Sequence, residues 1–194
     1  MRGSRVLTSL PVLLALALAT ACGGSDDSSS SNPTGTGAVV PPPSAPVSSD
    51  GQAVVPEGYS AVVIEVTQED GTTEEFCVWL AESSDQHQRG LMEVTSLGGA
   101  DGMLFRFPGD YAGSFWMKDT VLPLSIAFFA GDGAFVSTTD MEPCPPTAES
   151  CPLYQADGPY TDAVEVVQGD LPSLGIGSGS RLSVTDRSCQ PSGP

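Results

Sequence analysis

The chain is poor in positive charge, and this shortage excludes several classes of function. Seven Lys and Arg residues stand against 24 Asp and Glu residues, so the net charge is −17 at pH 7. Such a surface repels phosphate backbones, and nucleic acid is therefore not an expected partner. Histidine is reduced to His87, which we expect to be solvated on a short polar helix. No serine lies in the context of an activated nucleophile, so no catalytic residue is predicted.

Long hydrophobic runs are missing beyond the N-terminus, where one short run predicts export. Arg2 and Arg5 precede an apolar stretch at residues 6–19, which is too short for a permanent membrane helix and is typical of a signal peptide. Small residues lead into Cys22, and this context resembles a bacterial lipobox. It implies that residues 1–21 are removed and that Cys22 carries fatty acyl chains such as palmitate. The alternative is an ordinary signal peptide that leaves a free cysteine.

Large apolar side chains are almost absent from residues 23–56, which are rich in Ser, Gly and Pro. Burial cannot offset the entropy of ordering such a segment, so residues 22–57 are predicted to be a lipidated cysteine followed by a disordered tether. We expect one folded domain over residues 58–186 and a short tail over 187–194. Loss of Arg2 and Arg5 leaves 5 basic against 24 acidic residues, a net charge of about −19. The predicted location is the cell envelope, on a membrane facing the periplasm or the exterior, with the lipid bilayer as a partner.

Cysteine usage agrees with an oxidising compartment. Four cysteines remain in the folded region, and the predicted pairs are Cys144 with Cys151 and Cys77 with Cys189. The first pair would close a short loop that contains prolines. A zinc site is the alternative, but no histidine lies near and the spacing fits no usual finger.

Alternating apolar residues predict a domain of the α+β class. Strands are expected near residues 61–66, 75–80, 103–107, 134–138 and 163–167, with a last strand that ends near 184. Ser83 and Gln86 have the spacing of a capping box, and Gly90 is placed to end a helix of about two turns. The prediction is a compact, mostly antiparallel β domain of about seven strands with one short helix, shaped as a barrel or a sandwich.

The chain is organised around residues 113–120 (GSFWMKDT) and the apolar run at 123–129. The pattern predicts a strand, a short connection and another strand. Because side chains alternate along a strand, we expect Phe115 and Met117 to point inward and Trp116 to lie on the opposite face, under the helix or in a cleft.

Several segments together resemble the domain of unknown function 192 family. They are residues 88–92 (QRGLM), 102–105 (GMLF), 115–120 (FWMKDT), 123–126 (PLSI) and 174–182 (LGIGSGSRL). The resemblance implies a widespread prokaryotic domain that is often exported and has no established activity. Departures are Glu93 and Val94, where an aromatic and a basic residue are usual, Asp119 in place of asparagine, and Ser180 in place of an acid.

These segments contain a candidate binding surface formed by Arg89, Trp116, Lys118, Asp119 and Thr120. Polar residues between two strands are exposed on a rigid frame, which suits recognition of an anion or a sugar. The structural alternative is that Arg89 and Lys118 neutralise nearby acids while Asp119 and Thr120 bond to the backbone of the turn.

The sequence gives weaker support for two further kinds of site, a carboxylate pair and a copper site. Asp101, Asp110, Asp119 and Asp140 supply carboxylates, but their spacing selects no pair for acid–base catalysis. Met92, Met103 and Met117 could bind copper(I) or fill the core. The prediction is a non-enzymatic binding or assembly module without cofactor or metal, for an unknown envelope ligand or protein; the alternatives are an enzyme with a site near Lys118 and Asp119, and a copper-handling protein.

Overall fold

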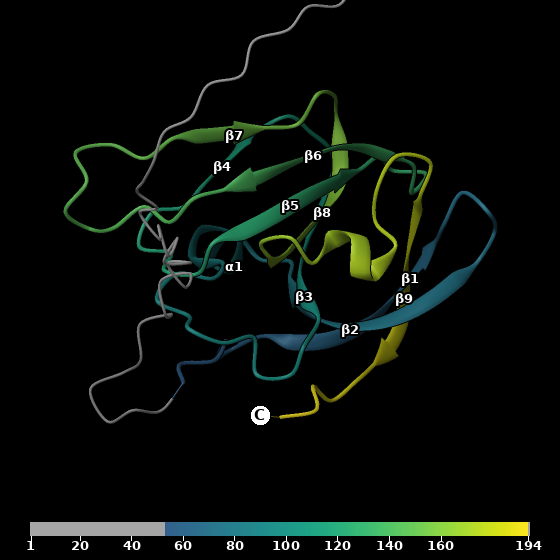
Figure 1. Ribbon diagram of the computed structural model, residues 1–194, viewed down its shortest axis with the longest axis horizontal. Coiled ribbons are helices and arrows are strands. Elements are labelled where there is room, and N and C mark those ends of the chain that lie inside the picture. Colours follow the sequence, from purple (N-terminus) through teal and green to yellow (C-terminus); the bar gives the residue numbers. More distant parts are fainter. Residues whose placement is uncertain (1–52, 194) are drawn as a thin grey trace, which may run out of the picture. The chain divides into compact units, whose positions relative to one another are not determined.

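The computed structural model describes residues 53–193 and shows a mostly β architecture (Figure 1). Cys22 and most of the predicted tether lie outside this range. The strands are β1 (Ser60–Thr67), β2 (Thr73–Ala81), β3 (Gly102–Tyr111), β4 (Ser114–Trp116), β5 (Leu124–Phe129), β6 (Phe135–Met141), β7 (Leu153–Gln155), β8 (Tyr160–Val167) and β9 (Arg181–Ser188). The helices are α1 (Ser84–Arg89) and the 3-10 turn η1 (Leu171–Leu174). No helix within the described range is long and apolar enough to cross a membrane.

Seven strands form one sheet in the order β6-β5-β8-β3-β2-β1-β9, and β4 pairs with β7 in a separate two-stranded sheet. All pairs are antiparallel except β2 with β3, which are parallel because the chain crosses over through α1 between them. The predicted mostly antiparallel, sandwich-like class is confirmed, and the described residues form no closed barrel. The count of about seven strands was low because β7 has three residues and no clear alternation.

Short-range signals in the sequence correspond well to the observed elements. Strands β1 and β2 form the expected hairpin. The Ser83 side chain accepts from the backbone N–H of Gln86, whose own side chain accepts from the backbone N–H of Ser83, so the capping box is present. Gly90 follows the helix with φ 46°, a conformation that glycine adopts without a steric penalty.

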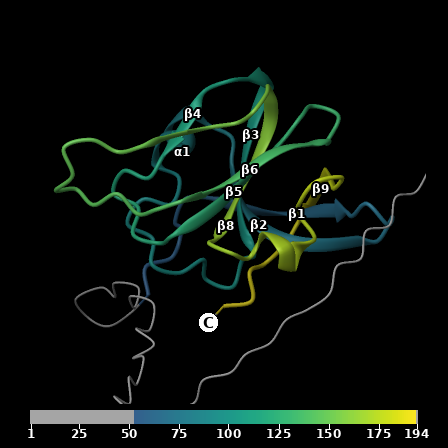
Figure 2. The same ribbon diagram turned by 45° about the horizontal axis from the view of Figure 1, so that its top comes forward.

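Apolar side chains cover both faces of the seven-stranded sheet. Along β3, Met103 and Phe105 belong to one buried cluster and Leu104 to the other. Strand β5 is buried along its whole length. Figure 2 shows α1 and β4 near each other beside β3, and this region covers the face that carries Met103 and Phe105.

The four cysteines of the described chain form two disulfides. Cys77 of β2 is bonded to Cys189 just after β9, and Cys144 is bonded to Cys151. Both predicted pairings are confirmed, and the zinc alternative is therefore wrong. The long bridge joins two strands that lie on either side of β1.

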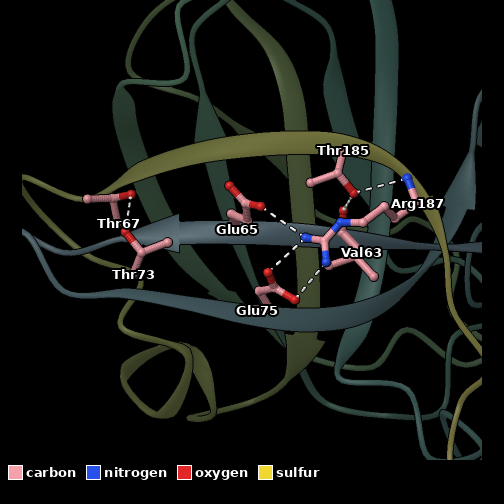
Figure 3. A network of polar contacts seen from close by, with 7 residues as sticks. All are labelled: Val63, Glu65, Thr67, Thr73, Glu75, Thr185 and Arg187. Atoms are coloured by element: carbon pink, nitrogen blue, oxygen red, sulfur yellow. Dashed lines mark hydrogen bonds and ion pairs between the residues drawn. The ribbon is translucent and has the colours of Figure 1, made fainter.

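Arg187 also holds these three strands together (Figure 3). Its guanidinium group donates to Glu75 of β2 at 2.8 and 3.0 Å and to Glu65 of β1 at 2.9 Å. The hydroxyl group of Thr185 donates to the carbonyl of Val63 at 2.7 Å. The C-terminal end of the described chain is thus bonded to the sheet. At the N-terminal end, the backbone N–H of Val54 donates to the hydroxyl group of Thr95, in the loop between α1 and β3, at 2.8 Å.

Candidate functional site

A cleft of about 220 Å³ lies between α1, the outer part of β3, and β4. Five aromatic side chains line it: Phe105, Phe107 and Tyr111 from β3, and Phe115 and Trp116 from β4. One residue of the central strand β8, Glu165, also reaches it. The cleft therefore combines an aromatic lining with a carboxyl group supplied by the middle of the sheet.

Glu165 is only 4% exposed, although its side chain is that of an acid. Its strand neighbours are Met103 on β3 and Ile126 on β5, both fully buried. Within residues 53–193, no hydrogen bond or ion pair reaches its carboxyl group. Burial alone raises its pKa to about 8, because a charged carboxylate is poorly solvated there. At neutral pH the group is mostly a protonated acid.

Close packing of the backbone fixes the position of Glu165. At Gly102, where β3 begins, an added Cβ would lie 2.5 Å from the Glu165 carbonyl oxygen. A side chain at this position would push β3 away from β8. The glycine of the GMLF segment is thus required by the strand that carries the buried acid.

The aromatic walls are held by mutual packing. Phe115 makes an edge-to-face contact with Phe105 at 5.1 Å between ring centroids, and Phe107 is stacked on Tyr111 at 4.2 Å. Tyr160 lies behind them, and its hydroxyl group donates to the Gly113 carbonyl at 2.9 Å. Burial raises the pKa of Tyr160, so its hydroxyl group stays neutral.

Strand β4 presents alternate faces, as predicted. Phe115 packs against the buried cluster, Met117 just after the strand is 1% exposed, and Trp116 is 47% exposed at the cleft. The predicted alternation is confirmed.

Helix α1 supplies the basic side of the cleft through His87 and Arg89. The expectation that His87 is solvated was wrong: its ring is half-buried, lies 4.5 Å from the ring of Phe107, and its Nε2 is 3.0 Å from the Ala81 carbonyl oxygen. The ring of His87 thus lies beside the aromatic side chains of β3 and is only partly in contact with solvent. Tyr59 braces the end of the helix by donating to the Gly90 carbonyl at 3.0 Å, and burial raises its pKa.

The structure brings together part of the predicted surface. Arg89, Trp116 and Thr120 line the cleft, whereas Lys118 and Asp119 do not. Lys118 instead places its Nζ 5.6 Å from the centroid of the Trp116 ring. Neither Arg89 nor Lys118 forms an ion pair in the described part of the chain, so the neutralising role considered for them is not observed.

The turn that follows β4 is bonded to the short disulfide loop. The N–H of Asp119 donates to the Cys144 carbonyl at 3.0 Å, and the N–H of Cys144 donates to the Met117 carbonyl at 3.2 Å. Thr120 donates its hydroxyl to the Lys118 carbonyl at 3.3 Å, the turn contact that the structural alternative expected of it. After the loop, Leu153 of β7 pairs with Trp116. The Cys144–Cys151 loop therefore supports the wall that carries Trp116.

The three methionines considered for copper are spread over different surroundings. Met103 and Met117 are buried in the apolar cluster, and Met92 lines the cleft. Core packing accounts for the first two. Residues 53–193 contain no group of three or more His, Cys, Asp or Glu side chains arranged to hold a metal ion.

Sequence analysis missed Glu165 and the aromatic residues of β3. The available signal was an acid inside the apolar run at residues 163–167 (AVEVV), flanked on its own face by Ala163 and Val167. An acid in a central strand is unusual because burial of a charge is costly. That signal becomes useful once β8 is known to be central.

Comparison with known proteins agrees with these motifs. The model of the DUF192 family, described as an uncharacterized conserved family, matches residues 65–184. The chain belongs to the DUF192 family. Several solved structures resemble it. A protein of unknown function from Novosphingobium aromaticivorans DSM 12444 is 31% identical, with a TM-score of 0.57 over 68% of this chain and 91% of that one.

The second similar structure is that of a proposed transcription regulator from Sinorhizobium meliloti 1021. It is 28% identical, with a TM-score of 0.56 over 65% of this chain and 95% of that one. No match was found among curated proteins. The DUF192 domain accounts for β2 to β8 and the cleft, and Arg89, Trp116 and Glu165 all lie within the matched residues.

Proposed function

We propose that this DUF192 protein is a non-enzymatic binding module, held at a bacterial membrane by lipid on Cys22, whose ligand enters the cleft over Glu165. The observation that carries the proposal is the cleft itself. It joins a ring of aromatic side chains to the carboxyl group of Glu165, a residue that is 4% exposed and whose carboxyl group has no partner in residues 53–193. Binding sites typically have such a lining, mostly apolar with a few placed polar groups.

The size of the cleft limits the ligand. Pockets for drug-sized molecules hold roughly 300–1,000 Å³, and this one holds about 220 Å³. A molecule of about ten non-hydrogen atoms, or one end of a larger molecule, suits this volume. The lip is open, because Trp116 and Tyr111 are 47% and 42% exposed.

Binding is favoured over catalysis because the acid has no catalytic companion. Among the described lining residues, Glu165 supplies the one carboxyl group, and general acid–base cleavage of sugars needs two. The Nε2 of His87 is occupied by the Ala81 carbonyl. The description of the Sinorhizobium protein as a proposed transcription regulator is not extended to this chain, since a net charge of −17 disfavours DNA.

A thermal-shift screen tests the cleft. A library of small fragments is added to the full chain and to a Ser114→Phe variant, in which a larger side chain on β4 enters the cleft. Because a ligand stabilises the state it binds, hits should raise the Tm of the wild type by a few °C at saturating concentration and leave the variant unchanged. Equal shifts in both proteins, or a library without a binder, would contradict the proposal.

The anchor is tested separately. Cells that express the wild type and take up an alkyne-bearing fatty acid should label this protein, and Cys22→Ser should abolish the label. A label that persists on the Cys22→Ser variant would show that the lipid is elsewhere.

A further inference from the structure

Glu165 lies where an acid is costly, and nothing in the described part of the fold offsets the cost. Its backbone is in the central strand β8, between Met103 and Ile126. A carboxyl group that is removed from most of its water without a hydrogen bond in the protein destabilises the fold, and a valine would fit the pattern of this strand. Since the side chain is directed to the cleft, a ligand there is the natural partner for its carboxyl group.

The side chains around this carboxyl group are mostly aromatic. Five aromatic rings line the cleft together with Glu165. The face of an aromatic ring is electrically negative and attracts cations within about 6 Å. The same ring type already attracts a cation on this protein, because the Lys118 ammonium lies 5.6 Å from the Trp116 ring centroid. Rings and acid together favour a positive ligand.

We propose that the cleft takes a small organic cation, an ammonium or alkylammonium group attached to an apolar body, with Glu165 as its counter-ion. This inference rests on the proposed binding function and names its ligand class. The ammonium group lies at Glu165, and the apolar body packs between Phe115, Trp116 and Phe107. The net charge of −17 draws cations toward the protein from a distance.

Arg89 sets a limit on this ligand. It lines the cleft and is exposed, and it forms no ion pair with Glu165 in the described residues. The second positive charge of a doubly charged ligand would be repelled by Arg89. The cleft thus favours one positive charge at its inner end and a neutral or acidic group near Arg89.

Binding of a cation should release a proton. Burial keeps Glu165 protonated near neutral pH, and an ammonium group beside it stabilises the carboxylate form. The other charged or titratable groups near the cleft are Arg89 and His87 of α1, Tyr59 before β1, Tyr111 of β3, and Lys118 beside the Trp116 ring. A His87→Gln variant separates the histidine from this effect.

The experiment is calorimetric titration of the full chain at pH 7 with matched probes. Benzylamine and benzyltrimethylammonium carry the charge, and benzyl alcohol has the same apolar body without it. We expect the two cations to bind at least tenfold more tightly than the alcohol. Titrations of benzylamine in two buffers of different ionisation enthalpy should show release of a proton that persists in His87→Gln.

Two variants make the test specific. Glu165→Gln keeps the shape of the protonated acid. It should lower the affinity for benzylamine at least tenfold and leave the affinity for benzyl alcohol unchanged. Glu74→Gln makes the same substitution on the exposed part of β2 and should change the affinity for benzylamine less than twofold. Binding of benzyl alcohol as tight as benzylamine, affinity for the amine that survives Glu165→Gln, or no binding of either cation would overturn the inference. If fragments still raise the Tm of the wild type and not that of Ser114→Phe, the proposed binding function holds even when this ligand class is wrong.

Discussion

Glu165 and Arg89 line the same cleft, yet no ion pair joins them within residues 53–193. The ion pairs of this region involve Arg106, Arg181 and Arg187 instead. The acid is held in the sheet by β8, and the arginine extends from the end of a short helix. A carboxyl group and a guanidinium group are thus available to a ligand from two independent elements.

Glu165→Gln should make the fold more stable, and by more as the pH rises. The pKa of Glu165 is about 8 in the folded chain and near 4.5 when unfolded, so the folded state binds the proton more tightly. The contribution of this group to stability is therefore greatest below pH 4.5 and is lost as the pH rises through 8. Glutamine does not ionise, so the variant keeps this stability. Chemical unfolding should show a free energy of unfolding higher than that of the wild type by on the order of a few kcal/mol at pH 8.5, and almost no difference at pH 4.5.

The control for this experiment is Glu74→Gln, whose difference from the wild type should not follow the same pH dependence. A gain for Glu165→Gln that is equal at pH 4.5 and 8.5 would mean that Glu165 has an ordinary pKa and is well solvated.

Phe115→Ala and Lys118→Ala should differ strongly, although the two residues are close in the sequence. The ring of Phe115 packs against Phe105, Phe128 and Tyr160 but is only partly buried. Its loss should therefore cost about 2–3 kcal/mol in urea unfolding, less than the roughly 3–5 kcal/mol of a fully buried phenylalanine. Lys118 is exposed and contacts the Trp116 ring, which makes its removal worth at most about 1 kcal/mol. A Lys118→Ala protein that fails to fold would show that this lysine has a structural partner.

Loss of the two disulfides should have different consequences. Cys77 and Cys189 are 112 positions apart, and the loop-entropy relation gives about 5 kcal/mol for such a bridge against about 2.5 kcal/mol for Cys144–Cys151. Replacing the long pair by alanines should therefore lower the unfolding free energy more. Replacing the short pair should instead lower the affinity of fragments for the cleft, because that loop supports Trp116. The opposite assignment of the two effects would contradict this role of the short loop.

Asp119→Asn should stabilise the protein by about 1 kcal/mol. Asp119 has φ 55°, a conformation that asparagine tolerates, and its Oδ1 is buried without a hydrogen bond among the described residues. A neutral amide leaves no uncompensated charge on an oxygen that lacks a hydrogen bond, and the turn bonds of the backbone stay in place. Thermal unfolding measures the change, and a lower Tm for Asp119→Asn would show that the carboxylate is satisfied in solution.

Elements with local signals could be predicted from the sequence. The capping box of Ser83 and Gln86, the β1–β2 hairpin and the alternation of Phe115, Trp116 and Met117 all depend on spacing within a few residues. Cys144 and Cys151 could be paired because a short loop brings them together. The family segments identified Arg89, Trp116 and Thr120 as neighbours in space.

The centre of the cleft could not be predicted, because it depends on strand order. Glu165 is 76 positions from Arg89 in the sequence, and β8 reaches the cleft by inserting between β3 and β5. His87 looked solvated because a polar helix of two turns gives no sign of the aromatic surface beneath it. Lys118 and Asp119 are adjacent to cleft residues in the chain, but the turn directs them elsewhere.

Fluorine NMR tests the central claim, that the cleft over Glu165 is where this protein binds its ligand. The chain contains two tryptophans, so incorporation of 5-fluorotryptophan gives two signals, which a Trp116→Phe variant assigns. Trp116 lines the cleft, whereas the indole of Trp79 donates to the Leu97 carbonyl outside it. Fragments that raise the Tm should shift the Trp116 signal and leave that of Trp79 in place. Stabilising fragments that leave the Trp116 signal unmoved would show that the ligand binds elsewhere.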